Sequence, residues 1–193
     1  MAEEKAEEKV ALQDSKVERS RRALEPMPHL RAQVVRGFGR GSKLLGFPTA
    51  NMNVRWDFME TPEKLTPEER DVLDFARSCE PGIYYGWAQG SNGADSGVYK
   101  TAMSVGWNPT FPDVKAKTIE PWILHDYAED FYDCELRLIV CGFVRPEAKF
   151  ADFKDLIVAI REDGDFCRET LETAELAAIA KDLFFVSKEA EVA

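Results

Sequence analysis

The stretch GIYYGWAQG, residues 82–90, indicates the fold class. Ile83, Tyr85 and Trp87 stand at alternate positions, and a period of two is the spacing of side chains on one face of a β-strand. A proline precedes this stretch, and its end runs into the turn signal GSNG. VYKTAMSVG, residues 98–106, comes next and is predicted to pair with residues 82–90 as a hairpin.

Three further segments, on either side of this hairpin, have the character of strands. They are RAQVVR (31–36), KTIEPWILHDY (117–127) and CELRLIVCGFV (134–144). Gly, Pro, Asn and Asp join these segments, and no helix alternates regularly with them. Several short strands of this kind indicate an antiparallel barrel or sandwich, not a doubly wound parallel sheet.

A helical insertion is predicted within residues 57–80. TPEERDVLDFARS, residues 66–78, begins with a capping box, in which Thr66 is followed three residues later by Glu69. A proline occupies the first helical position, where its missing N–H costs nothing. These signals place a short helix between strands.

A second helix is predicted after the last strand, over residues 152–171. Its apolar residues at helical spacing are Phe153, Leu156, Ile157 and Ile160. Asp152 is the expected N-cap, and Gly164 is expected to interrupt or weaken the helix. We expect the apolar stripe to pack on the barrel rather than to bind a partner. A last short helix is predicted over residues 174–182, ahead of the apolar LFFVS.

Charged residues mark the ends of the predicted domain. Residues 1–28 are dominated by Glu, Lys, Arg and Ala, offer little apolar surface for docking, and are expected to form a disordered tail. Residues 29–188 are expected to form one domain, and residues 189–193 a short C-terminal tail.

Composition narrows the classes of function. The net charge of −10 argues against general binding of nucleic acid or of an anionic membrane, so any phosphate must be bound by a local pocket. No stretch approaches the roughly 18 apolar residues of a membrane span, and the N-terminus has no apolar signal core. The four cysteines form no CxxC pair and are expected to be reduced thiols. A cytoplasmic protein is the expectation.

The glycine-rich loop GFGRGSK, residues 37–43, satisfies neither common nucleotide-binding pattern. Lys43 is followed by Leu44, which breaks the Walker A motif, and the third glycine of the Rossmann fingerprint is absent. Alternate glycines with Arg40 and Lys43 nearby can form an anion-binding concavity. A flexible turn with incidental charge is an equally good interpretation of this loop alone.

Two neutral oxygen ligands follow the loop in GFPTAN. Thr49 and Asn51 point to the same face if the segment is extended, and Mg²⁺ accepts such a partial set when phosphate and water complete it. The alternative is that both side chains bond the backbone at the start of a strand.

Glu120, in KTIEPWIL, is the candidate general base. Pro121 biases it toward an extended backbone and suggests an edge or rim position. A carboxylate among Ile119, Trp122 and Ile123 is costly unless it is used or paired. As a lone residue, Glu120 would be read as a surface glutamate.

Six motifs in register give the sequence a close resemblance to the riboflavin kinase (flavokinase) family. They are VVRGFGRGSKLLGFPTAN (34–51), GIYYGWA (82–88), SVGWNPTF (104–111), IEPWILHDYAEDFYD (119–133), GFVRPEAKF (142–150) and FFVSK (184–188). The resemblance implies a six-stranded antiparallel Greek-key barrel with a C-terminal helix. It also implies transfer of the γ-phosphate of ATP to the ribityl 5′-hydroxyl of riboflavin, giving FMN and ADP.

The resemblance also implies roles for individual residues. Glu120 matches the catalytic glutamate that accepts the proton of the 5′-hydroxyl, and Thr49 and Asn51 match the ligands of Mg²⁺, with Zn²⁺ or Mn²⁺ as alternatives. The residues implied to contact ATP are Gly37, Lys43, Thr49, Asn51, Ile123, His125 and Tyr132, and those implied to contact riboflavin or FMN are Arg145, Ala148 and Phe150. A purely structural role for His125 stays open.

The chain departs from the family pattern at several positions. Asp133 stands where glycine is common, so the local turn is expected to differ, and Pro121-Trp122 replace a Thr-His pair of animal forms. Ala148 lacks the side chain often present there, so any contact with flavin would be through its backbone.

Two rival functions follow from the same motifs. One is a barrel that binds FMN or riboflavin without catalysis, although Thr49, Asn51 and Glu120 argue for a metal and a base. The other is a two-domain FAD-synthesising enzyme, but no nucleotidyltransferase domain precedes residue 31. We expect a monomer whose partners are the small molecules riboflavin and ATP, with no nucleic acid and no membrane.

Overall fold

The predicted hairpin is the centre of the sheet. The parts of the chain that the computed structural model describes are residues 17–37, 46–90, 95–107 and 116–186. Strands β4 (Gly82–Gly90) and β5 (Val98–Trp107) pair antiparallel, with Ile83 opposite Ser104 and Trp87 opposite Lys100. The hairpin prediction is therefore confirmed.

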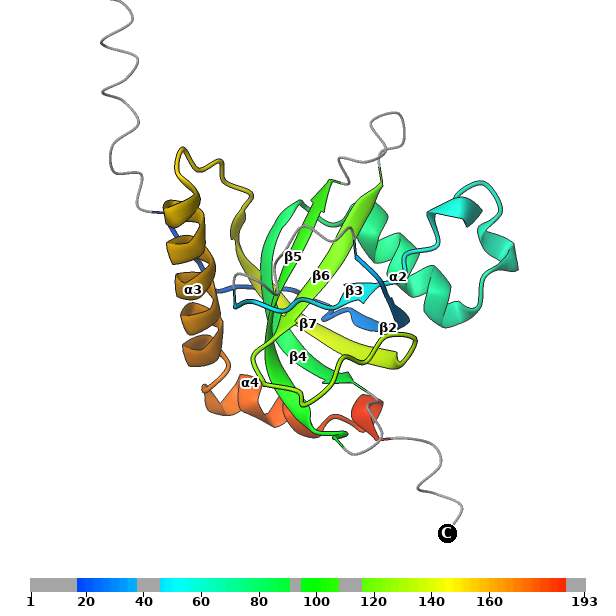
Figure 1. Ribbon diagram of the computed structural model, residues 1–193. Helices are drawn as coiled ribbons and strands as arrows, with labels where there is room; N and C mark the ends of the chain where they lie inside the picture. The colour runs from blue at the N-terminus through cyan, green and yellow to red at the C-terminus, as the bar shows by residue number, and fades with distance from the viewer. Residues whose placement is uncertain (1–16, 38–45, 91–94, 108–115, 187–193) are drawn as a thin grey trace, which may run out of the picture.

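Six strands form a nearly closed antiparallel barrel (Figure 1). The other strands of the barrel are β2 (His29–Val35), β3 (Asn51–Met52), β6 (Lys117–Ile123) and β7 (Glu135–Pro146), and a further short strand, β1 (Arg22–Ala23), pairs with β7 outside this set of six. The order β3-β2-β7-β4-β5-β6 places β7 beside β4, the first strand of the β4-β5-β6 meander, which is a Greek key. Where the two ends of this order meet, the Ala50 N–H donates to the Pro121 carbonyl at 2.9 Å. The predicted fold class is confirmed.

Strand β6 is shorter than the sequence indicates. The strand predicted over residues 117–127 ends at Ile123. The chain then bends, because His125 stacks flat on Tyr99 of β5 and Tyr127 meets the His125 ring edge-on. The residues after Ile123 therefore leave the sheet and form a loop.

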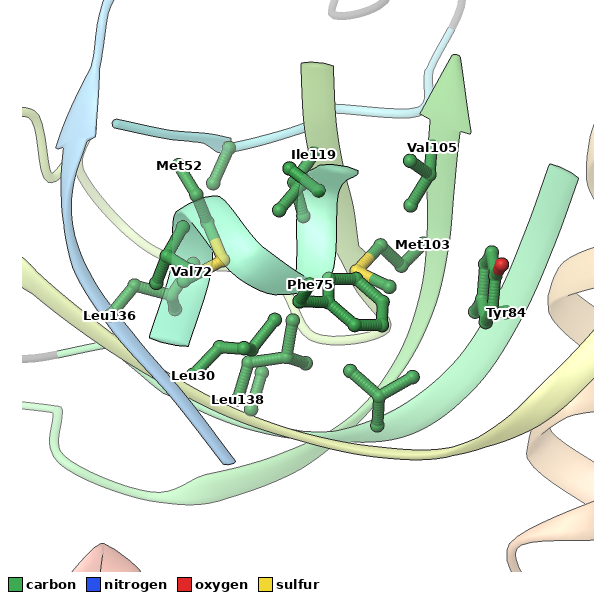
Figure 2. Packing of buried hydrophobic residues seen from close by; sticks show 14 of the residues in the cluster. Leu30, Met52, Val72, Phe75, Tyr84, Met103, Val105, Ile119, Leu136 and Leu138 are labelled. Atoms are coloured by element: carbon green, nitrogen blue, oxygen red, sulfur yellow. The ribbon is translucent and has the colours of Figure 1, made fainter. Parts of the chain in front are cut away.

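Helix α2 (Pro67–Ser78) supplies side chains to the barrel interior. Its capping box is confirmed, since the Glu69 N–H donates to Thr66 Oγ1 at 3.2 Å and the Thr66 N–H donates to Glu69 Oε2 at 3.0 Å. Two short 3₁₀ turns, η2 (Trp56–Phe58) and η3 (Pro62–Lys64), lead into it. Figure 2 shows Val72 and Phe75 of α2 among interior side chains of the strands. Each such fully buried side chain stabilises the fold by roughly 1.5–3 kcal/mol, so the insertion is part of the core.

Helix α3 (Phe153–Thr170) lies on the opposite side of the barrel from α2 (Figure 1). Its Asp152 N-cap is confirmed, with the Lys154 N–H donating to Asp152 Oδ1 at 2.8 Å. α4 (Ala174–Ala178), η4 (Ile179–Lys181) and η5 (Leu183–Phe185) continue along the outer face. A second apolar cluster joins Cys167 and Leu171 to Tyr85 and Trp87 of β4.

Two details of the α3 prediction are wrong. Gly164 does not interrupt the helix; it lies against the barrel, where a Cβ would stand 2.4 Å from Cζ3 of Trp122. Glycine is present because the helix approaches an indole ring at this point. The apolar stripe also does not pack along its whole length, since Phe153 in the first turn is 56% exposed.

The prediction of a disordered tail is wrong for residues 17–28, and residues 1–16 lie outside the described residues. β1 pairs with β7, with Arg22 opposite Phe143. The Ser20 N–H donates to the Val144 carbonyl at 2.8 Å, and the Leu24 N–H to the Cys141 carbonyl at 3.0 Å. Arg19 and Arg22, two of the charged residues that suggested disorder, form ion pairs with Asp163 and Glu80 of the folded domain. The domain therefore begins before residue 29.

Asp133 holds the turn before β7 in a left-handed conformation. It has φ of 64° and is the one non-glycine residue with positive φ among the described residues. Its N–H donates to the Val34 carbonyl at 2.8 Å, and its carbonyl accepts from Gln33 Nε2 at 3.1 Å. These bonds hold Asp133 in a conformation that glycine adopts without cost, so the turn is compatible with the glycine common in the family.

Replacement of Asp133 should separate this backbone effect from any role of the carboxylate. We expect Asp133→Ala to lower the free energy of unfolding by about 1 kcal/mol, because alanine is strained at positive φ. Asp133→Gly should cause no loss. Urea denaturation of the two variants measures the difference, and equal losses in both would show that the side chain matters and not the backbone.

Candidate active site

Glu120 faces the helix side of the barrel wall. Ile119 and Ile123 on the same strand are buried in the interior, so the alternate residues Glu120 and Trp122 point to the other face. Glu120 lies opposite Ser104 on β5, and Ser104 lies opposite Ile83 on β4. The register thus places one row of side chains across three strands, beneath α3.

A cavity of about 190 Å³, here called the helix-side cavity, lies over this row. Its lining residues are Phe47, Thr49, Ile83, Ala102, Met103, Ser104, Glu120, Trp122, Ile160 and Asp163. Most of these side chains are apolar, and Phe47 meets the Trp122 ring edge-on with 4.9 Å between centroids. The half-buried Glu120 carboxylate therefore stands in an apolar, aromatic surrounding. This chamber suits a planar hydrophobic ligand that carries hydroxyl groups.

Asp163, on the α3 wall of the helix-side cavity, belongs to a buried ion pair. Arg145 at the end of β7 donates from Nε to Asp163 Oδ1 at 3.0 Å and from Nη2 to Asp163 Oδ2 at 2.6 Å. Both side chains are 4% exposed. Because a bidentate pair of this kind is rigid, it fixes α3 against the strands.

A second cavity, of about 500 Å³, opens on the other side of Thr49 and is here called the loop-side cavity. Its lining residues are Val34, Pro48, Thr49, Ala50, Ile123 and residues 125–132. Thr49 belongs to the walls of both cavities. Ligands in the two cavities would therefore both lie against residue 49.

Asn51 and Gly37 lie against each other beside the loop-side cavity. Asn51 pairs with Val35 across β3 and β2, and a Cβ on Gly37 would stand 2.5 Å from Asn51 Nδ2. A side chain at position 37 would therefore displace the Asn51 amide. Lys43 lies outside the described residues.

The candidate metal ligands fit a partial coordination set. Thr49 and Asn51 stand two residues apart in the segment that leads into β3, and both offer neutral oxygens. The described residues contain no cluster of three His, Cys, Asp or Glu side chains that could hold a metal by themselves. The donors therefore fit a hard cation that arrives with a phosphate, and do not fit a closed protein cage.

His125 is held on three sides. Its ring is stacked on Tyr99 with 3.7 Å between centroids and 4° between planes, and Tyr127 meets it edge-on at 4.9 Å. Its Nε2 lies 2.7 Å from Asp95 Oδ2, and Asp95 Oδ1 accepts from the Tyr99 hydroxyl at 2.7 Å. The Tyr99 hydroxyl, followed by the Gly97 N–H and His125, lowers the pKa of the Asp95 carboxyl. The imidazole is therefore presented to the loop-side cavity in one fixed orientation.

The family is decided by comparison with known proteins. The profile of the flavokinase family, described as riboflavin kinase, matches residues 24–171. This chain belongs to the riboflavin kinase family. Human riboflavin kinase is 42% identical over 159 residues, which cover 82% of this chain and 90% of the human protein. The crystal structure of riboflavin kinase from Trypanosoma brucei superposes with a TM-score of 0.60 at 28% identity, covering 83% of this chain and 89% of that one.

A longer relative contains the same domain. The bifunctional riboflavin kinase/FMN phosphatase of Arabidopsis thaliana is 43% identical over 154 residues, which are 80% of this chain and 36% of that protein. The chain thus spans little more than a third of this relative. No described helix is long and apolar enough to cross a membrane.

The structure gathers most of the residues that the riboflavin kinase resemblance singles out. Thr49, Ile123, His125 and Tyr132 line the loop-side cavity, and Thr49 and Glu120 line the helix-side cavity. The three residues expected to contact flavin do not line either cavity. Arg145 is buried with Asp163, Ala148 is exposed, and Phe150 is half-buried in the connection to α3.

Ser104 and Asp163 line the helix-side cavity, and Asp95 and Tyr99 hold His125 of the loop-side cavity; none of these four roles was expected from the sequence. Ser104 could have been found, because pairing of the predicted strands places it beside Glu120. Asp163 carried a weaker signal, as a carboxylate on the buried face of α3, three residues after Ile160. Asp95 carried none, since it reaches His125 from a loop.

The Asp95 network can be measured by titration. NMR should find the pKa of the Asp95 carboxyl below its ordinary value, and Tyr99→Phe should raise it, because the Tyr99 hydroxyl is the main cause of the shift. The carboxylate thus contributes stability above its ordinary pKa, and that contribution is lost as the pH falls through the lower, folded-state value.

Tyr127→Phe is the matched control, since the Tyr127 hydroxyl does not bond Asp95. Burial raises the pKa of Tyr127 to about 12. Removing its hydroxyl should leave the Asp95 titration unchanged. An Asp95 carboxyl that titrates normally in the unaltered protein would contradict the geometry.

Proposed function

We propose that the protein transfers the γ-phosphate of ATP to the ribityl 5′-hydroxyl of riboflavin, giving FMN and ADP. The observation that carries this proposal is the position of Thr49 between two cavities, with Glu120 in the wall of the apolar one. Phosphoryl transfer requires an acceptor hydroxyl held in line with the γ-phosphate and beside a base. Two cavities that meet at one polar residue provide that arrangement.

The two substrates differ in the chamber that suits them. ATP is assigned to the loop-side cavity, whose volume of about 500 Å³ and aromatic side chains suit a nucleotide. The ribityl chain and flavin edge are assigned to the helix-side cavity, where Phe47 and Trp122 offer aromatic surface. The ribityl 5′-hydroxyl then lies beside Thr49 and Glu120.

Glu120 is proposed to accept the proton of the ribityl 5′-hydroxyl. The hydroxyl oxygen then bonds the γ-phosphorus of ATP, and the bond from that phosphorus to the ADP oxygen breaks. Ser104, opposite Glu120 across the strand pair, offers a hydroxyl that can orient the carboxylate. Catalysis is mainly positioning in an apolar chamber that excludes water, so that the phosphoryl group reaches the alcohol and not a water molecule.

A divalent cation, Mg²⁺ or alternatively Zn²⁺ or Mn²⁺, is proposed to be held by Thr49 and Asn51 together with phosphate oxygens of ATP. It would neutralise phosphate charge during transfer. Lys43, by resemblance, would contact the same phosphates. The protein is further proposed to act in the cytoplasm as a monomer without nucleic-acid or membrane partners, in keeping with its net charge of −10.

Product analysis tests the whole proposal. The purified chain should convert riboflavin to FMN in the presence of ATP and Mg²⁺, as detected by chromatography, and EDTA should abolish the conversion. A folded sample that binds riboflavin and makes no FMN would favour the non-catalytic flavin-binding barrel.

Substitution of the base should affect turnover and not binding. Glu120→Gln keeps the shape of the side chain and removes its basicity, so kcat should fall by about 10²–10⁴-fold. Riboflavin affinity, measured by quenching of flavin fluorescence, should stay nearly unchanged. Glu80→Gln is the matched control, because Glu80 forms an exposed pair with Arg22. A parallel loss of affinity and turnover would instead assign Glu120 a structural role.

Removal of a proposed metal ligand should change the requirement for metal. Asn51→Ala should raise the Mg²⁺ concentration needed for half-maximal activity, because one of two protein oxygens is lost. Asn53→Ala, two residues along the same segment, serves as control. An unchanged Mg²⁺ titration in Asn51→Ala would remove Asn51 from the ligand set.

A further inference from the structure

An N-terminal strap, defined as residues 17–23, contacts the helix that forms one wall of the helix-side cavity. The strap precedes the region matched by the family profile, which begins at residue 24. It is nevertheless fixed to the barrel, through β1 and through the Ser20 N–H, which donates to the Val144 carbonyl at 2.8 Å.

Arg19 is the strap residue that reaches α3. Its Nε donates to Asp163 Oδ1 at 2.8 Å, and its Nη2 donates to the Ala159 carbonyl at 3.2 Å. Its Nη1 lies 3.1 Å from Glu162 Oε2. The Arg19 side chain is only 11% exposed. One guanidinium thus binds three residues within little more than one turn of helix.

Asp163 is shared between two arginines from different parts of the chain. Oδ1 accepts from Nε of Arg19 and from Nε of Arg145, so the carboxylate is clamped between the strap and β7. The same carboxylate, with Ile160 one turn earlier, lines the helix-side cavity opposite Glu120. The position of this wall therefore depends on Arg19 as well as on Arg145.

We propose that Arg19 is a positioning residue for the flavin substrate: it sets the α3 wall of the helix-side cavity and thereby the affinity for riboflavin. This inference rests on the assignment of riboflavin to that cavity under the proposed function. Without Arg19, Asp163 keeps one guanidinium, and the helix loses its three contacts to the strap. Ile160 and Asp163 are then free to shift relative to Trp122.

The effect should be confined to one substrate. Among the described residues, those that line the loop-side cavity belong to β2, the segment 48–50, the end of β6 and the loop 125–132. None of these belongs to the strap or to α3. A displaced α3 should therefore weaken riboflavin binding and leave the apparent affinity for ATP unchanged.

The test compares three variants of the full chain. Arg19→Met keeps the apolar stem and removes every donor, and Arg19→Lys keeps the charge with one compact donor group. Arg22→Met is the matched control in the same strap, because Arg22 is 54% exposed, pairs with Glu80 and stacks on Phe143 away from the cavity.

Riboflavin Kd is measured without ATP, by quenching of flavin fluorescence, and the KM values for riboflavin and ATP are measured from FMN formation. We expect Arg19→Met to raise the riboflavin Kd and KM roughly tenfold, a size typical of a misplaced binding group. Arg19→Lys should show a smaller rise, and Arg22→Met none. The KM for ATP should stay constant in all three.

Thermal unfolding separates positioning from simple loss of stability. A folded Arg19→Met with lowered Tm and unchanged riboflavin Kd would overturn the proposal, as would equal rises in both KM values. If Arg19→Met does not fold, the same comparison is decided by Arg19→Lys. Because the Kd is measured without turnover, a failure of the kinase assay would not be mistaken for a failure of this inference.

Discussion

The two ends of the strand order are joined at a backbone hydrogen bond, which the Ala50 N–H donates to the Pro121 carbonyl. Proline has no N–H, so this position of β6 offers only an acceptor, which Ala50 satisfies. Thr49 and Asn51 flank Ala50, and Glu120 precedes Pro121. The contact that joins the two ends of the sheet therefore also brings the candidate metal ligands beside the candidate base.

Features that depend on local patterning were predictable from the sequence. The β4–β5 hairpin, the capping box of α2 and the Asp152 cap of α3 follow from side-chain period and from residues within four positions of each other. The face on which Glu120 lies follows from the same period. That Thr49 and Glu120 belong to one site could be expected only from the family resemblance. The two residues are 71 positions apart, and no local sequence pattern predicts contact over such a separation.

Features that depend on distant polar partners were not predictable. Arg19 and Asp163 are 144 residues apart, so the strap looked like any solvated charged tail. From the sequence, Gly164 looked like a helix breaker. Its physical reason is the indole ring of Trp122 on β6, which leaves no room for a Cβ and which no pattern near residue 164 reveals. Trp122 and Gly164 are thus complementary in size. A ring on one element is accommodated by a missing side chain on the other.

The shared wall at Thr49 has a thermodynamic consequence. Any movement of residue 49 that accompanies filling of one cavity also alters the shape of the other. Such an effect is a coupling free energy, and linkage makes it reciprocal: if the nucleotide changes the affinity for the flavin by some factor, the flavin changes the affinity for the nucleotide by the same factor. The free energy of the doubly occupied state is the same by either order of binding. Which singly occupied form predominates is then set by the two separate affinities and the two substrate concentrations.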